Sequence, residues 1–460
     1  MGESVSPGIP SCNGYIRVEL NGHRTTSDSG ALLLREALDN SGVIEALEDN
    51  LVDQRHPLRI RHSLANQLRT LVLQRAMGWI DLSDTDTLRR GPLWQQLASS
   101  DARGMTPLTQ DRPSQATLSR LLTSLGRSDN IDAVHEGLLR LVVWRLTSLP
   151  HGERPEQLTL DIDGLPIEVH GHQGGSAFHG LYGARIYSPL VASLAETGDR
   201  VGGLLREGKA GPAENADTWI PHLVRRLNEI TGARVRVRID ASFTDNDTLE
   251  ALEDRGIEYL DRLRSHSGLQ KLEAPYLKRP PGRPPQQPRE WCHELEYQAG
   301  SWPVPRCEVL VVQERPDDLL LHAFFLVTNL GTFDWPPEKV LALYRKRGSA
   351  DAHMGEVKSA LDLHLSSTDR GASTVQDVMA RNEMSLLLNL YAYQVLHGLR
   401  RLLESRTRQG WSLMQMREQV LKVAATLTVH VRRITLHLGD AADKWWPTLL
   451  KGLPRLTALA

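Results

Sequence analysis

Apolar residues recur at helical spacing through the first third of the chain. Within residues 62–77 and 130–146, leucine and valine return every three to four positions. A stripe of this kind is typical of helices that pack against a shared core. We therefore expect residues 1–150 to form an N-terminal helical region.

The pattern changes at about residue 156. Residues 157–163 and 234–240 alternate apolar and polar positions, which is typical of strands, and each stretch ends in an aspartate. A stretch with helical spacing lies between them. This succession predicts an α/β fold, a mixed sheet flanked by helices, with residues 156–264 as the first part of a core.

Residues 265–335 interrupt that core with a β-rich insertion. Three more stretches alternate within it: residues 291–298, 305–314 and 319–329. A proline-rich segment before them fits an extended linker, although its Arg283 also suits an arm that inserts into a DNA minor groove. Trp302 could stack on an unpaired base or pack within the hairpin. Both pairs of interpretations stay open.

The rest of the chain returns mainly to helical patterns. We expect residues 336–404 to complete the core and residues 405–460 to form a C-terminal helical region. Within the latter, the spacing predicts a helix over residues 411–427 and an alternating strand over residues 429–438.

One predicted helix carries a polar stripe in place of an apolar one. Offsets of three, four and seven residues would bring four polar side chains near one face of a single helix, namely Tyr344, Arg347, Asp351 and Lys358. Burying such groups without partners is unfavourable. The stripe therefore predicts contacts with a polyanion and a metal ion.

Composition adds limits to this picture. The 460 residues carry a formal net charge of −2, so any DNA binding must come from local basic clusters. The three cysteines, Cys12, Cys292 and Cys307, lie far apart without a C-x2-C pair, which favours a reduced compartment over a disulfide framework or zinc site. The chain has no signal segment and no apolar run of 18 residues, so we expect a cytoplasmic protein without membrane association.

Three acidic residues stand where metal chemistry is expected. Asp163 and Asp240 end strands, where open α/β sheets have their sites, and Asp351 lies on the polar stripe. Carboxylates from separate elements are suited to holding two Mg²⁺ ions. We choose Asp163 as the first acid because it precedes the flexible Gly164, and Asp161, on the same side of the strand, is the alternative.

These acids lie in motifs that resemble a known family. The three acids lie in Leu160-Asp-Ile-Asp163-Gly, Arg238-Ile-Asp240-Ala-Ser-Phe and the polar stripe, and a fourth motif, Phe325-Leu-Val-Thr-Asn-Leu330, closes the insertion. The sequence resembles the DDE transposases of bacterial insertion sequences, in the branch whose last acid lies in a Tyr-x2-Arg-x3-Glu-x6-Lys signature. The likeness extends to Leu88-Arg-Arg-Gly-Pro, to residues 115–120 and to residues 431–436, and so covers most of the chain.

The resemblance implies a ribonuclease-H-like core that cleaves DNA and transfers strands. Asp163, Asp240 and Asp351 would be its catalytic acids and would hold two Mg²⁺ ions, for which Mn²⁺ can substitute. The family has Glu where this chain has Asp351, which shortens the side chain by one bond of about 1.5 Å. Glu356 lies five residues further on and points to another face of the helix, so it does not replace Asp351.

The resemblance also implies DNA contacts from the polar stripe. Arg347 and Lys358 would hold phosphates near the cut, and Tyr344 would contact the end of the element's DNA. The alternative is a surface ion-pair network of these basic residues with Glu356 and Asp362.

A second candidate DNA contact lies in the N-terminal region. The segment from Arg112 has a serine N-cap and a hydroxyl-rich first turn and a half. This composition suits a helix whose N-terminal end meets a DNA groove through Gln115, Thr117, Ser119 and Arg120, and a solvated surface is the alternative.

Taken together, these features predict a transposase that binds the terminal inverted repeats of a mobile element. Its partners would be double-stranded DNA, at element ends and target, and a second copy of the chain, because pairing two ends requires at least a dimer; we expect it to associate with the nucleoid. Two alternatives stay open. One is a catalytically impaired or domesticated DNA-binding relic, and the other is a ribonuclease-H-like nuclease without strand transfer.

Overall fold

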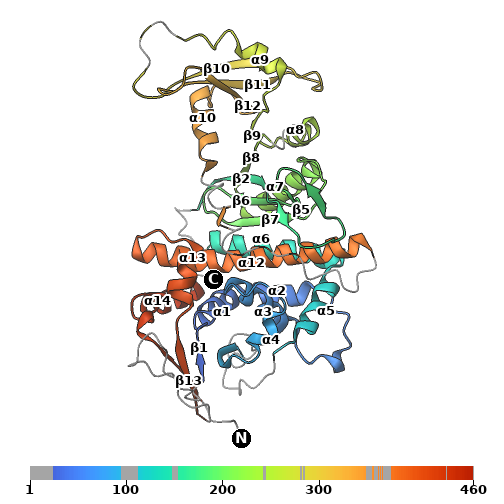
Figure 1. Ribbon diagram of the computed structural model, residues 1–460, viewed down its shortest axis with the longest axis vertical. Coiled ribbons are helices and arrows are strands. Elements are labelled where there is room, and N and C mark those ends of the chain that lie inside the picture. Colours follow the sequence, from blue (N-terminus) through green and yellow to red (C-terminus); the bar gives the residue numbers. More distant parts are fainter. Residues whose placement is uncertain are drawn as a thin grey trace, which may run out of the picture.

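A long helix, α12 (Val375–Thr407), crosses the middle of the molecule, with the N-terminal helices on one side and a large sheet on the other (Figure 1). The computed structural model describes residues 24–94, 112–147, 154–241, 245–279, 282, 285–348, 355–356, 361, 363, 365, 374–430 and 433–458. None of the helices in this described part is long and apolar enough to cross a membrane.

The N-terminal region is helical, as its spacing predicts. It contains α1 (Ala31–Asn40), α2 (Val43–Asn50), the short 3-10 helix η1 (Pro57–Arg59), α3 (Leu64–Ala76), α4 (Asp84–Leu88), α5 (Gln115–Leu125) and α6 (Ser128–Thr147). Serine side chains cap two of these helices: Ser63 accepts from the backbone N–H of Asn66 in α3, and Ser114 accepts from that of Thr117 in α5. The helices predicted over residues 62–77 and 130–146 are confirmed.

Eight strands form one mixed sheet. They are β2 (Gln157–Gly164), β6 (Leu190–Leu194), β7 (Arg200–Leu204), β8 (Arg234–Arg238), β9 (Tyr259–Arg262), β10 (Arg289–Tyr297), β11 (Arg306–Glu314) and β12 (His322–Thr328). Their order in the sheet is β10-β11-β12-β9-β8-β2-β6-β7. β2, β8 and β9 run parallel, while β2, β6 and β7 form an antiparallel meander. The order β7-β6-β2-β8-β9 is that of a ribonuclease-H-like core, which confirms the expected fold class.

Shorter elements surround the sheet. α7 (Ala216–Thr231), α8 (Asn246–Glu253) and α9 (Ser267–Glu273) bury apolar side chains in the same core as the strands. A second small sheet joins β3 (Ile167–Glu168), β5 (Ala184–Tyr187) and β4 (Ala177–His179).

The insertion extends the core sheet. β12 pairs antiparallel with β9, so the three strands predicted within residues 265–335 continue the same sheet. α10 (Pro337–Arg345) then buries Val340, Leu341 and Leu343 against β9, β11 and β12. The strands of the insertion lie at one end of the molecule, and α10 runs from them back toward β2 and β8 (Figure 1).

Helix α6 joins two hydrophobic cores. Its Val134 and Leu138 pack with the N-terminal helices and α12, whereas its Val142 and Leu146 pack with the sheet and α7. α12 begins with a capping box, in which Thr374 and Asp377 each accept the other's backbone N–H. Helix α6 therefore belongs to both the core of the N-terminal helices and the core of the sheet.

Two predicted helices end earlier than expected. α10 stops at Arg345, and the backbone N–H of Arg347 bonds to the carbonyl of Tyr344, which is a tight turn before Gly348. The single helix predicted through Lys358 is therefore wrong at this point.

The second correction concerns residues 411–427. α13 (Leu413–Met416) and a π turn (Arg417–Leu421) are followed by β13 (Ala425–His430), which pairs with β1 (Thr25–Thr26) and β14 (Arg433–Leu438). The threonine- and valine-rich end of the segment favours this strand. α14 (Trp446–Ala458) completes the described chain.

Candidate active site

The two strand-end aspartates lie at the same edge of the sheet. β2 and β8 are parallel neighbours with Asp161 beside Arg238, so Asp163 and Asp240, each two residues further on, lie at the carboxyl ends of adjacent strands. Because β2 and β8 are adjacent, Asp163 and Asp240 lie close together although 77 residues separate them in the sequence.

Arg347 joins these aspartates. Its Nη2 donates to Oδ1 of Asp163 and lies 3.7 Å from Oδ2 of Asp240. The side chains of Arg347 and Asp163 are 11% and 9% exposed, whereas that of Asp240 is 35% exposed. A ligand in solvent therefore meets the pair from the side of Asp240.

Asp161 has a different environment. It is fully buried and accepts two hydrogen bonds from Arg238, Nε to Oδ1 at 2.6 Å and Nη2 to Oδ2 at 2.8 Å. The remaining Nη1 of Arg238 donates to the carbonyl of Leu343 in α10 at 2.6 Å. Burial raises the pKa of Asp161, and Arg238 opposes that rise. This bidentate pair connects β2, β8 and α10.

Tyr344 lies at the end of α10, next to the aspartate pair. Its ring lies 6.4 Å from that of Phe324, and the guanidinium of Arg262 covers Phe324 at 4.8 Å. Burial raises the pKa of the Tyr344 phenol, while Arg347 and Arg262 oppose that rise. Tyr344 and Arg347 are therefore brought to the site although they do not share one helix.

Arg200, which the sequence did not single out, lies behind the acids on β7. It is fully buried, and its guanidinium lies over the ring of Tyr393 of α12 at 5.3 Å. Burial lowers its pKa, and the charges of Asp163 and Asp161 are among the groups that oppose this. No local sequence pattern predicts a buried cation here, because its neighbours come from distant segments.

Glu356 forms contacts that differ from the expected surface network. Its carboxylate pairs with Nη1 of Arg400 in α12 and accepts from the backbone N–H of Leu413 at 2.7 Å. Arg347 contacts Asp163 and Asp240 instead, while Lys358 and Asp362, the other members of that alternative network, lie outside the described residues.

Other predicted site residues lie elsewhere. Trp302 is 8% exposed and packs between Tyr297 and Arg306, so the hairpin-packing interpretation accounts for its position. Asp351, Lys358 and Arg283 lie outside the described residues. Within the described ranges, no group of three or more His, Cys, Asp or Glu side chains is placed to hold a metal ion.

The predicted DNA-reading helix is α5, and the structure does not bring it to the acids. α5 lies across α12 from the sheet (Figure 1). On α5, Gln115 and Arg120 are exposed, and Thr117 and Ser119 are half-buried. The two candidate sites are therefore separate surfaces of one molecule.

Three comparisons relate this chain to known proteins. One similar solved structure is a piggyBac transposase synaptic complex with hairpin DNA; at 10% sequence identity, the alignment covers 85% of this chain and 78% of that chain, with a TM-score of 0.38. A search of curated protein sequences finds no significant match. The family model "Transposase DDE domain group 1" matches residues 10–457, nearly the whole chain. The chain therefore belongs to the DDE transposases, enzymes that cleave DNA and transfer its strands.

Proposed function

We propose that this transposase mobilises a bacterial insertion sequence and that Asp163, Asp240 and Asp351 are its catalytic acids. The observation that carries this assignment is the convergence of Asp163 and Asp240 on one nitrogen of Arg347. Asp161, in contrast, has both oxygens engaged by Arg238 and is assigned a structural role.

The acid pair fits a hard divalent cation. Transposases of this family depend on divalent metal ions, and we propose Mg²⁺, two per site, with Mn²⁺ as a substitute. Two carboxylates that already converge on a positive charge offer the oxygen ligands that Mg²⁺ prefers. When bound, such ions would activate the attacking hydroxyl and stabilise the leaving oxygen.

The residues around the pair have distinct roles in this proposal. Arg347 neutralises part of the charge of the two carboxylates and lies where a phosphodiester crossing the strand ends would accept its hydrogen bonds. Tyr344, at the end of α10, would contact the DNA end, and Lys358 would hold a neighbouring phosphate. The greater exposure of Asp240 supports entry of DNA from its side.

Recognition of the element is assigned to the N-terminal region. The exposed Gln115 and Arg120 of α5, with Thr117 and Ser119, support binding of the terminal inverted repeats in double-stranded DNA. Because two ends must be paired before strand transfer, we propose a homodimer as the active assembly.

A strand-transfer assay tests this proposal. The purified chain is incubated with Mg²⁺ or Mn²⁺, matched element ends and a target plasmid, and joined products are counted for the wild type, Asp240→Ala and Asp254→Ala. Asp254 is an exposed acid after α8 and serves as the matched control. We expect joining by the wild type and Asp254→Ala alone. Equal joining by Asp240→Ala would refute the assignment of the acids.

A further inference from the structure

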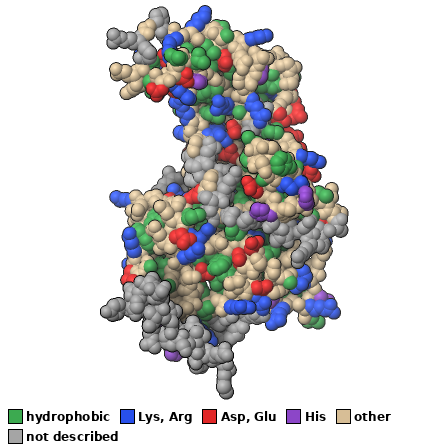
Figure 2. All heavy atoms as spheres, viewed as in Figure 1, with side chains coloured by type: hydrophobic (Ala, Val, Ile, Leu, Met, Phe, Trp, Pro, Cys, Tyr) green, Lys and Arg blue, Asp and Glu red, His purple; other side chains and the backbone are tan. Residues whose placement is uncertain are grey.

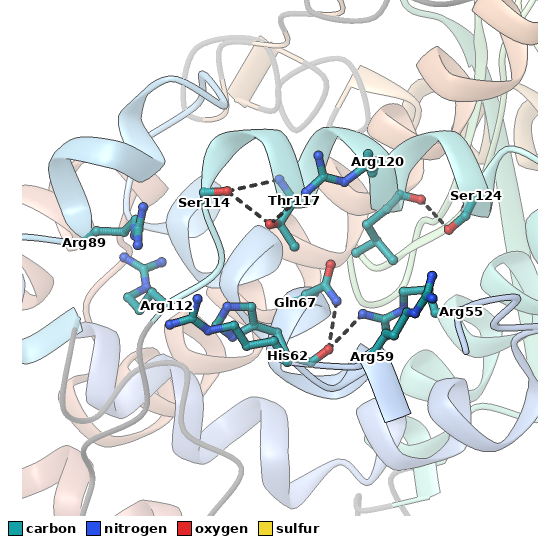
Figure 3. Close-up of a pocket in the computed structure, with 12 residues that line it drawn as sticks. Arg55, Arg59, His62, Gln67, Arg89, Arg112, Ser114, Thr117, Arg120 and Ser124 are labelled. Atoms are coloured by element: carbon teal, nitrogen blue, oxygen red, sulfur yellow. Dashed lines mark hydrogen bonds between the residues drawn. The ribbon is translucent and has the colours of Figure 1, made fainter. Parts of the chain in front are cut away.

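A strongly basic cavity lies in the N-terminal region, distant from the acid pair. We call it the α5 pocket; its volume is about 460 Å³, and Figure 3 shows its lining. Its cationic lining residues are Arg55, Arg59, Arg61, Arg89, Arg112 and Arg120, with His62 beside them. Among the described residues, no Asp or Glu lines it. The pocket therefore gathers positive charge without an acidic group in its own wall.

Arg112 differs from the other arginines of the pocket in its deep burial. It is 2% exposed, and none of its guanidinium nitrogens has a hydrogen-bond partner in the described part of the chain. Its guanidinium lies over the ring of Trp94, 4.7 Å from the ring centroid, in a cation–π contact. Burial and the nearby charge of Arg89 lower the pKa of Arg112 to about 9. A buried cation beside another cation is unfavourable unless an anion joins them.

The walls of the pocket are arranged to receive such an anion. One wall is the first turns of α5, where Ser114 and Thr117 face the cavity and the helix N-terminus adds positive potential. The opposite wall is the exposed segment around η1, which carries Arg59 and Arg61 (Figure 3). Arg112 lies next to Arg89 at one end of the cavity.

Among the described residues, two acids that contact arginines of the pocket already have these partners. Asp53 forms a bidentate contact with Arg55, and Asp86 lies 3.9 Å from Arg89 and accepts weakly from the N–H of Gln115 at 3.4 Å. Figure 2 shows Lys and Arg side chains along the lower part of the molecule, where the N-terminal helices lie. Neither acid reaches Arg112, so the imbalance of charge remains at the base of the pocket.

We propose that the α5 pocket binds a backbone phosphate of duplex DNA, with Arg112 and Arg89 as its principal donors. This inference rests on the proposed function and adds to it a phosphate anchor that sets the register of α5 on the DNA. Phosphate oxygens match the planar donor fork of arginine. The two basic walls suit a strand of the duplex that runs between α5 and the η1 segment, with Gln115 and Arg120 exposed beside it.

The test measures DNA binding without catalysis. Wild type, Arg112→Met, Arg112→Lys and the control Arg255→Met are titrated with a fluorescent 30-base-pair duplex in EDTA, between about 50 and 200 mM salt, and their thermal melting is recorded. Arg255 is an exposed arginine after α8, outside the pocket. We expect Arg112→Met to melt at or above the wild-type temperature, because it removes a buried charge that lacks an anion.

For the same variant we expect a roughly 5- to 10-fold weaker duplex affinity and a salt slope smaller by about one phosphate contact. Arg112→Lys keeps the charge and should keep the slope, which also tests the pocket if Arg112→Met does not fold. Duplex binding by Arg112→Met equal to wild type would overturn the proposal. So would a melting temperature that inorganic phosphate raises in an Arg112-dependent way while duplex affinity stays unchanged, since that would identify a small free anion.

The two proposals fail separately. If Asp240→Ala joins strands like the wild type but Arg112→Met loses duplex affinity, the acid assignment fails and the pocket stands. If Asp240→Ala is inactive and Arg112→Met binds normally, the pocket fails and the acid assignment stands.

Discussion

The acid pair and the α5 pocket carry an excess of opposite charge. At the sheet edge, two carboxylates share one guanidinium, so negative charge is in excess. In the α5 pocket, arginines gather with no acid in the described lining, so positive charge is in excess. One site is suited to a cation and the other to an anion.

A buried pair of opposite charges in the same molecule provides a reference for these two sites. Asp161 and Arg238 satisfy each other in a buried bidentate pair, which connects three elements. A buried ion pair of this kind stabilises the native arrangement but offers nothing to a ligand. Imbalance, more than the mere presence of charged residues, distinguishes the candidate sites from the scaffold.

The largest effect is expected from Asp163. Asp163→Asn should lower the strand-transfer rate by at least ~10³-fold, because a metal supplies several kcal/mol of transition-state stabilisation. The unfolding temperature should change little. Joining rates and thermal melting are measured on the same preparation. Normal joining by Asp163→Asn would shift the first acid to Asp161 and remove the contrast between the two.

Asp161 should give the reverse result. Asp161→Asn leaves the buried charge of Arg238 without its counterion and with one acceptor fewer, so we expect the free energy of unfolding to fall by ~3–5 kcal/mol. Strand transfer should persist at temperatures where the variant is folded. Urea unfolding measures the loss, and Asp161→Leu combined with Arg238→Met should recover much of it. A stable but inactive Asp161→Asn would contradict the structural role.

The smallest effect on stability is expected from Glu308, a buried carboxyl that has no charged partner among the described residues and yet lies in neither candidate site. It is fully buried in β11, and within the described ranges neither carboxyl oxygen has a hydrogen-bond partner. Burial raises its pKa from 4.5 to about 8. The raised pKa favours the protonated, neutral form at neutral pH, so this buried carboxyl needs no cationic ligand.

The pH dependence of stability tests this interpretation. Between pH 4.5 and about 8 the folded chain keeps a proton that the unfolded chain releases, so stability should fall as pH rises, by at most ~1.4 kcal/mol per pH unit. Glu308→Gln should remove this slope, and Glu294→Gln, an exposed position on neighbouring β10, is the control. Urea unfolding at pH 5 and pH 8 measures it. An unchanged slope in Glu308→Gln would mean that Glu308 is ionised in the folded chain.

Local sequence patterns predicted most elements of the fold. Strands β2 and β8 alternate, and the serine cap of α5 precedes a clear helical stripe. The pairing of β12 with β9 could not be predicted, because pairing between distant strands leaves no local periodicity. The early end of α10 was missed because a polar stripe at helical spacing does not report a tight turn.

The site was predictable only in part for similar reasons. Alternate residues of a strand face one side, so periodicity cannot separate Asp161 from Asp163; their arginine partners do so in space. Glu356 pairs with Arg400, which lies 44 residues further along the chain. The environment of Arg112 is set by Arg89, which lowers its pKa, and by the ring of Trp94. Such contacts depend on tertiary packing, which a single sequence does not encode in any short motif.

Helix α6 has a consequence for how this transposase can diversify. Its Leu138 packs with the N-terminal helices and its Val142 with the sheet, so the boundary between the two regions runs along the helix itself. A chimera that took the N-terminal helices from a relative would import an α6 face shaped for another sheet. With the proposed role of α5 in end binding, we expect new DNA-end preferences to be more accessible through point substitutions on α5 than through exchange of the whole N-terminal region.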